Sequence, residues 1–160
     1  MCGFLVLRTM FKALKEKSKK IQRLNQDKMM QVILNDSVLQ AQIVDLNQKQ
    51  LYEHGVDANG NPTGEYAPST IYGTSNFEGK IAKGQRYDHV TLKDTGAFYD
   101  SMVVKSLPEE IQIKADTVVE SGVDLRDQWP AAVGLTKESI REILPEIKQT
   151  LVEKIRNAIA

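Results

Sequence analysis

The chain has 160 residues, 41% of them hydrophobic, which is enough for one core and too few for two sizeable domains. Its 21 basic and 21 acidic residues leave no net charge, which argues against binding nucleic acid or membranes through overall charge. The single cysteine cannot form an internal disulfide, and the apolar run near the start is far shorter than the ~20 residues that cross a bilayer. We therefore expect one domain over residues 1–160, without a membrane anchor.

The first 30 residues differ in charge from the rest. They contain eight basic and two acidic side chains, a net charge of +6, so the remaining 130 residues carry −6. Apolar residues at helical spacing, with lysines between them, predict an amphipathic helix over 9–28. Such polarity suits a molecule whose ends meet different partners or other copies of itself, and a solvated basic helix face is the alternative. Either Met1 or Met10 could be the natural start.

A second helical pattern covers residues 27–52, and no glycine or proline interrupts the chain between Phe4 and His54. One long or slightly broken helix is predicted there, so residues 1–53 form a helical N-terminal region. Val44 belongs to one apolar face of this helix and Ile43 to another. A helix that is apolar on two sides lies either deep in a core or between subunits, so both residues are candidates for an interface.

Residues 55–89 are rich in glycine, asparagine, aspartate and serine, which predicts an extended loop or hairpin arm. Within it, Asp57 to Gly60 favours a tight turn over a calcium loop, because an EF-hand has its glycine two positions later. An irregular segment of this length is typical of one that contacts a partner. The residues predicted to make that contact are Tyr66, Tyr72, Lys80 and Arg86.

Thr91 to Ser101 is predicted to form a corner between this arm and the core. Asp94 and Thr95 can hydrogen-bond to nearby backbone, Gly96 can adopt a left-handed conformation, and Phe98 can be buried by a single helical turn that ends near Ser101. The Asp-Thr-Gly triplet also occurs in the catalytic loop of aspartic proteases. The flanking residues are too polar for a buried carboxyl dyad, and the chain has no second such loop.

The segment 90–135 is predicted to be β-rich. Residues 102–106 and 110–115 form a hairpin, residues 117–121 add a third strand, and Trp129 either covers the core or contacts a partner. Thr136 is the expected N-cap of an amphipathic C-terminal helix over 136–160, which Pro145 should kink.

No catalytic, cofactor-binding or metal-binding residues are predicted, and we expect no enzyme activity. Cys2 would be an N-terminal nucleophile if Met1 were removed, but the following residues do not resemble the amidotransferases that use one. His54 and His89 are the only histidines, and neither has cysteine or carboxylate neighbours at metal-ligand spacing.

The order of these motifs resembles that of tailed-phage virion-morphogenesis proteins, the tail-completion or head–tail connector group. That group has an Asp, a Gly, an aromatic residue, a Thr and a Lys before a Leu-x-x-Thr-Gly-x-Leu-x-x-Ser element. The similar positions here are Asp57, Gly60, Tyr66, Thr70, Lys80, Leu92, Thr95, Gly96, Phe98 and Ser101. A later Pro-Arg-x-Phe-Leu-Gly-Leu-Ser/Thr stretch of the group is similar to residues 130–136, although Ala131-Ala132 replaces the arginine.

The resemblance covers residues 30–158 and implies an α+β fold. Its parts are a long N-terminal helix, a central antiparallel sheet with a glycine-rich arm, and the C-terminal helix. It also implies a structural virion protein that completes or connects the head–tail neck as a ring of six or twelve copies, built in the host cytoplasm. Its partners would be other copies and neighbouring neck, tail or portal-adaptor proteins, with DNA contact only in the channel. A tail terminator or stopper ring, or a small nucleic-acid-binding regulator, is the alternative.

Overall fold

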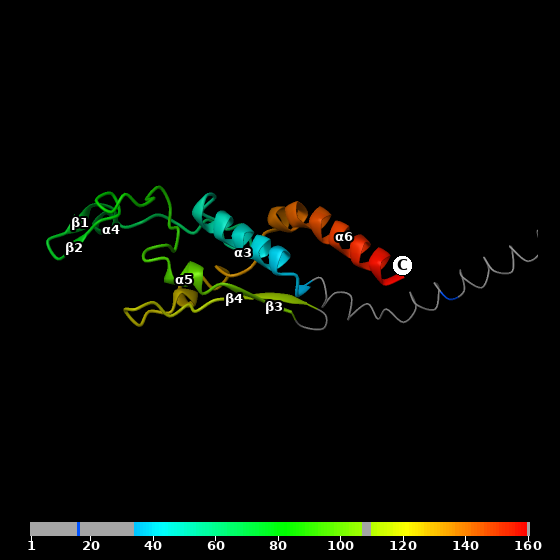
Figure 1. Cartoon of the computed structure of the whole chain (residues 1–160). Helices are drawn as coiled ribbons and strands as arrows, with labels where there is room; N and C mark the ends of the chain where they lie inside the picture. The colour runs from blue at the N-terminus through cyan, green and yellow to red at the C-terminus, as the bar shows by residue number, and fades with distance from the viewer. Residues whose placement is uncertain (1–15, 17–33, 107–109, 160) are drawn as a thin grey trace, which may run out of the picture.

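The computed structural model describes Glu16, residues 34–106 and residues 110–159 of the protein (Figure 1). Within these residues the fold mixes four α-helices with two small antiparallel sheets of two strands each. The α-helices are α3 (Ser37–Tyr52), α4 (Pro68–Tyr72), α5 (Ala97–Asp100) and α6 (Lys137–Ile159). The strands are β1 (Gly73–Thr74), β2 (Phe77–Glu78), β3 (Val103–Ser106) and β4 (Ile111–Lys114), and a 3-10 helix, η1, spans Leu125–Asp127.

Helix α3 begins where Asp36 caps it. The Asp36 Oδ1 atom accepts hydrogen bonds from the backbone N–H groups of Val38 (3.1 Å) and Leu39 (3.4 Å). The helix predicted over 27–52 is therefore interrupted just before Ser37 and confirmed from there to Tyr52. Apart from Glu16, the predicted N-terminal helix lies outside the described residues.

The core lies between α3, α6 and the β3–β4 hairpin. Helix α3 packs against both β3 and α6, and Lys154 near the end of α6 reaches Asp36 at the start of α3 (3.6 Å), so the two helices are antiparallel (Figure 1). The shared core cluster consists of Leu39, Ile43, Leu46, Val104 and Ile143. Ile43 is 2% exposed and belongs to the chain's own core, so its side chain is not available to a partner, whereas Val44 is half-buried at the edge of this face.

Two buried amide side chains connect α3 to the segment that leads into α6. Asn47 donates to the Ala132 carbonyl and accepts from the Gly134 N–H, both at 3.0 Å. Gln50 donates to the Gly134 carbonyl (2.6 Å) and accepts from the Thr136 N–H (3.0 Å). Both amides are at most 2% exposed, and every polar group in these four bonds is paired.

Helix α6 begins after Thr136, as predicted, because the Thr136 hydroxyl accepts a hydrogen bond from the Ser139 N–H (3.1 Å). The helix continues through Pro145. Ile143 packs in the core and Ile147 and Leu151 pack against it, whereas Ile140 and Leu144 on the neighbouring stripe are exposed.

The predicted hairpin of residues 102–115 is confirmed by β3 and β4, which pair with Val103 opposite Lys114 and Ser106 opposite Ile111. The predicted third strand over 117–121 is wrong. That segment folds back on itself around Gly122, with Val119 N–H bonded to the Val123 carbonyl (2.9 Å) and Leu125 N–H bonded to the Thr117 carbonyl (2.8 Å). The backbone groups of this segment bond to one another, so within the described residues β4 pairs with β3 alone and its other edge has no strand beside it. We call residues 116–125 the Val118 loop.

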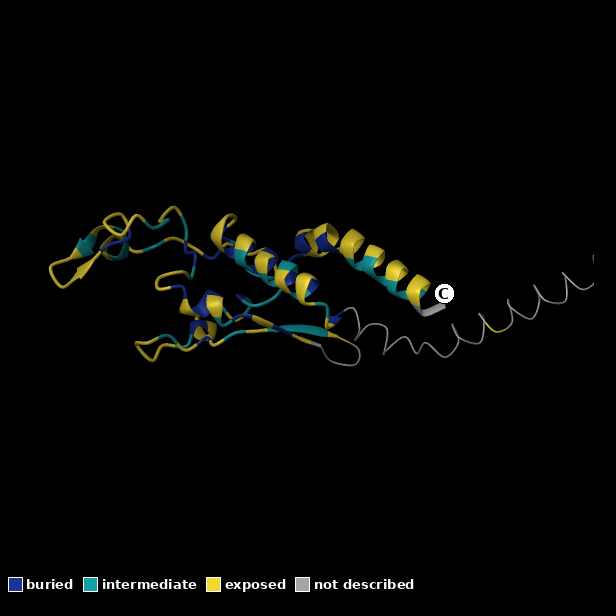
Figure 2. Cartoon of the chain, viewed as in Figure 1, coloured by how far each residue is buried: buried dark blue, intermediate teal, exposed yellow. Residues whose placement is uncertain are grey.

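The arm, residues 55–89, projects from the end of the body where α3 terminates, and most of it is exposed (Figure 2). It contains the short β1–β2 hairpin, as expected of a loop or hairpin segment, and also helix α4, which was not predicted. Pro68 occupies the first position of α4, where its missing N–H costs nothing. The hairpin closes tightly, because a Cβ atom on Gly79 would lie 2.2 Å from the Gly73 nitrogen.

Replacing Gln50 by alanine should lower the free energy of unfolding by about 2–4 kcal/mol, since it removes buried hydrogen bonds and leaves the Gly134 carbonyl and Thr136 N–H without partners. Urea denaturation measures this change. The matched control is Gln149→Ala on α6, where the exposed side chain bonds only to Glu153 (3.1 Å), and a change within about 0.5 kcal/mol is expected. Equal effects of the two substitutions would contradict the role given to Gln50.

Candidate functional site

The corner predicted at Thr91–Ser101 is present and is built around Gly96. Gly96 has φ 97°, a left-handed conformation, and forms the N-cap of α5, while the Thr95 hydroxyl accepts from the Ala97 N–H (3.3 Å). The single turn of α5 buries Phe98 and Tyr99, whose rings meet edge to face at 5.8 Å. The prediction that a single helical turn buries Phe98 is therefore confirmed.

Two further contacts connect the corner to its surroundings. The Ser101 hydroxyl donates to the Phe98 carbonyl (2.7 Å) and accepts from the Asp116 N–H (2.9 Å), which fastens the Val118 loop to the corner. Asp94 receives a salt bridge from Lys83 of the arm (3.1 Å). Leu92 has φ 56°, the only positive φ among the described residues other than glycine, so the backbone is strained where the arm enters the corner.

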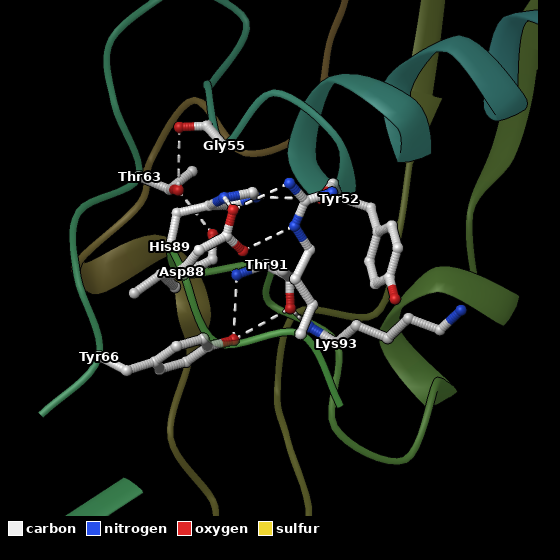
Figure 3. Close-up of polar contacts among 10 residues, drawn as sticks. Tyr52, Gly55, Thr63, Tyr66, Asp88, His89, Thr91 and Lys93 are labelled. Atoms are coloured by element: carbon white, nitrogen blue, oxygen red, sulfur yellow. Dashed lines mark hydrogen bonds and ion pairs between the residues drawn. The ribbon is translucent and has the colours of Figure 1, made fainter. Parts of the chain in front are cut away.

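Thr91 joins the arm to the corner (Figure 3). The Tyr66 hydroxyl accepts from the Thr91 N–H and shares a hydrogen bond with the Thr91 hydroxyl, both at 3.0 Å. The Tyr99 hydroxyl donates to the Thr91 carbonyl (2.6 Å). All three polar groups of this 1% exposed threonine are thus paired, and the burial of Tyr99 raises the pKa of its phenol well above the usual 10.0.

The base of the arm is closed by a second group of contacts, of which Figure 3 draws those made by Thr63 and His89. The Thr63 hydroxyl lies 3.0 Å from the Gly55 carbonyl and 2.5 Å from that of Val90, and His89 Nε2 donates to the Tyr52 carbonyl at the end of α3 (3.0 Å). Trp129 donates its indole N–H to the Thr63 carbonyl (2.7 Å). The tryptophan therefore covers this junction, and its polar edge is used within the chain.

Lys80 and Arg86, two of the predicted contact residues, are engaged by the chain itself. Lys80 is only 5% exposed; its ammonium donates to Gln85 Oε1 and to the Lys93 carbonyl, each at 3.0 Å, and lies 4.6 Å from the Tyr66 ring centre. Arg86 forms a two-bond ion pair with Asp88 (2.7 and 2.9 Å), and the hydrogen bond from the guanidinium holds the pKa of Asp88 far below its ordinary value. Both cations are therefore paired within the chain.

A cleft of 730 Å³ lies between the arm, the corner and the Val118 loop. Its volume falls within the range usual for binding sites. The apolar residues on its wall are Phe77, Val90, Leu92, Ala97, Phe98, Val118, Val119, Leu125 and Trp129. The charged residues on its wall are Glu78, Lys80, Lys83, Lys93, Asp94, Asp116 and Glu120. Neither histidine nor cysteine contributes to the wall, and its composition suits the binding of an apolar segment with charged flanks.

The cleft brings together most of the residues predicted from the sequence. All five corner residues, Asp94, Thr95, Gly96, Phe98 and Ser101, line it, as do Tyr66, Lys80 and Trp129. Tyr72 is 74% exposed on the arm and lies outside the cleft, as do Arg86, Ile43 and Val44. Sequence analysis missed the buried hydroxyls of Thr63 and Thr91, because a threonine in a polar stretch carries no periodic signal of burial.

The described residues contain neither a candidate metal cluster nor a helix that could span a membrane. In residues 34–106 and 110–159, no three histidine, cysteine or acidic side chains are grouped so that they could hold a metal ion. Among the helices of the same residues, none has both the length and the apolar character needed to traverse a bilayer.

Removing the Tyr66 hydroxyl should weaken the connection between arm and corner. Tyr66→Phe should lower the free energy of unfolding by about 1–3 kcal/mol, because the buried Thr91 N–H loses its acceptor. Tyr87→Phe, on an exposed ring of the same arm, is the matched control and should be neutral within about 0.5 kcal/mol. Chemical denaturation measures both, and equal values would contradict the assignment.

Stability should also fall as the pH rises above about 10. The folded state holds Tyr99 as a neutral phenol with a raised pKa, so its contribution is complete below the unfolded value of 10.0 and is lost above it. In Tyr99→Phe, unfolding midpoints measured from pH 8 to 11 should depend less on pH than in the wild-type chain. Tyr72→Phe should keep the wild-type slope, and identical slopes in all three proteins would show that Tyr99 does not carry the effect.

Comparison of the chain with protein-family models, curated proteins and solved structures found no match. The resemblance to phage virion-morphogenesis proteins therefore stays a prediction from the motif pattern.

Proposed function

We propose that this protein is a structural subunit of a tailed bacteriophage that completes or connects the head–tail neck as a ring. The observation that supports the proposal most is the convergence of the motif residues on one surface. Ten positions resemble the family pattern up to Ser101, and eight of them line the cleft. These eight are Tyr66, Thr70, Lys80, Leu92, Thr95, Gly96, Phe98 and Ser101.

The motif positions come from two separate stretches, the arm and the corner. Their common location gives the pattern a physical meaning, because a cleft built from both stretches needs the turn at Gly96 and the fastening at Tyr66. The remaining pair, Asp57 and Gly60, form the tight turn near the arm's base, where Asp57 Oδ1 accepts from the Asn59 and Asn61 N–H groups (both 2.9 Å).

Exposed apolar side chains suit a subunit whose surfaces meet neighbours. On the arm, Tyr72 and Phe77 are 74% and 51% exposed, and Ile81 is similarly uncovered. On α6, Ile140, Leu144 and Val152 are exposed beside the stripe that packs in the core. A chain that worked alone would gain little from such surfaces, whereas a ring subunit of six or twelve copies would bury them.

Several roles remain candidates for such a subunit. The arm would contact an adjacent neck, tail or portal-adaptor protein, and DNA would be met only in the channel. A tail terminator or stopper ring would use the same surfaces at a different junction. A small nucleic-acid-binding regulator would instead use the basic N-terminal residues, which lie outside the described part of the chain.

Disruption of the gene in its phage should yield filled heads beside separate tails, because the subunit that completes the joint is missing. Electron microscopy of the lysate measures this. Expression of the wild-type chain, or of the surface control Gln149→Ala, should restore joined particles, whereas Tyr72→Ser combined with Phe77→Ser should fold and fail to do so. Intact, infectious particles without the gene would contradict the proposal and favour the regulator.

A further inference from the structure

Most basic side chains on the cleft wall are engaged by groups of the chain itself, whereas several acidic side chains form no ion pair with a described residue. Lys83 is paired with Asp94, Lys80 is buried among its own acceptors, and the Lys93 ammonium lies over the rings of Tyr52 (5.3 Å) and Tyr99 (5.4 Å). The exposed carboxylates of Glu78, Asp116 and Glu120, by contrast, form no ion pair with another described residue. The exposed Lys93 ammonium also forms no ion pair with a described residue, so three such carboxylates face one such ammonium and the cleft carries net negative charge beside its apolar wall.

The apolar wall is open on both sides of the cleft. Phe77 on the arm and Val118 on the loop are each about half exposed, and the partly buried Leu92 and Trp129 line the same cleft. Figure 1 shows the arm and the Val118 loop extending from the same end of the body. An occupant that complements this surface carries apolar residues flanked by positive charge.

The chain itself contains one segment of that kind. Residues 10–28 hold seven basic and two acidic side chains, a net charge of +5, together with Met10, Phe11, Leu14, Ile21 and Leu24. The other uncovered apolar surface, on α6, lies on a helix whose residues 137–157 hold five basic and four acidic side chains. Charge complementarity therefore favours residues 10–28 over α6 as the occupant of the cleft.

Chain length sets how far this segment can reach from the described body. The 16-residue helix α3 is about 24 Å long, and its far end at Tyr52 is fastened to His89 beside the cleft. Residues 29–33 join the basic segment to the start of the described body at Leu34, and five extended residues span at most about 17 Å. Residues 21–33 together span at most about 45 Å when extended, so Lys15, Lys19 and Lys20 can reach well beyond the start of the described body. A contact within one chain would join no copies, so the proposed self-assembly requires the cleft of the next copy.

We propose that residues 10–28 of one copy dock in the cleft of the next copy, with their lysines facing Glu78, Asp116 and Glu120. This inference rests on the proposed self-assembly and names the contact that produces it. The contact joins two different surfaces, head to side, and such heterologous contacts form a ring when the rotation between copies closes.

Thiol cross-linking between two full-length chains tests the contact. Cys2 is the only cysteine, so Cys2→Ser gives a background in which Leu14→Cys is placed in one chain and Val118→Cys in another. After mixing with a short bis-maleimide, a cross-linked dimer is expected. The matched control replaces Val118→Cys by Glu146→Cys on the exposed face of α6, and little dimer is expected. Equal yields from the two mixtures, or no dimer from the first, would overturn the proposal.

Charge reversal gives the second, independent measurement. Lys15→Glu, Lys19→Glu and Lys20→Glu together should lower the dimer yield about tenfold, and Glu78→Lys, Asp116→Lys and Glu120→Lys in the partner should do the same. Mixing the two charge-reversed chains should restore the yield. If the dimer yield falls when either chain alone is charge-reversed but does not recover when both are, the proposed pairing of charges is overturned.

The same samples separate this inference from the proposed function when they are examined by sedimentation velocity. An oligomer that persists in the lysine variant without the cross-link would overturn the docking contact and leave the ring proposal standing. A wild-type chain that stays monomeric, and whose loss leaves phage particles intact, would overturn both.

Discussion

The buried amides of Asn47 and Gln50 are the interaction on which the rest of the fold depends. They fix the Ala132–Thr136 segment against α3, and that segment sets both the start of α6 and the position of Trp129. Apolar side chains could have filled the same space, but a primary amide supplies both a donor and an acceptor that satisfy a passing backbone. These directional hydrogen bonds fix the orientation of the Ala132–Thr136 backbone relative to α3, whereas hydrophobic contact alone would not specify that orientation.

From this fixed frame the cleft follows in two steps. Trp129, held next to the amide-bound segment, reaches the Thr63 carbonyl and positions the base of the arm. Thr91 then joins arm and corner through Tyr66 and Tyr99. The arm side and the corner side of the cleft are therefore both hydrogen-bonded to the buried backbone of this one residue. The surface proposed to receive a neighbour is therefore attached rigidly to the core through neutral hydrogen bonds, while its outer charges remain in solvent.

Local patterns in the sequence predicted the corner, the β3–β4 hairpin and the Thr136 cap, because each depends on residues close together in the chain. They could not predict that Asn47 and Gln50 face inward, since polar side chains at helical spacing are expected on the solvent side. Lys80 was placed at a surface for the same reason, although the fold gives it two acceptors and an aromatic ring. The cleft itself escaped prediction because its walls come from three separate stretches of chain.

The long sequence separation of these contacts has a consequence for the order of events during synthesis. The Trp129 bond to Thr63 spans 66 residues and the Asn47 bond to Ala132 spans 85, so the arm's base and the frame behind it lack their partners until about four fifths of the chain has been made. A partly synthesised chain would already possess its basic N-terminal residues but not a completed cleft. Incomplete subunits could insert into a finished neighbour yet could not receive one, so each would end the growth of an assembly rather than propagate it.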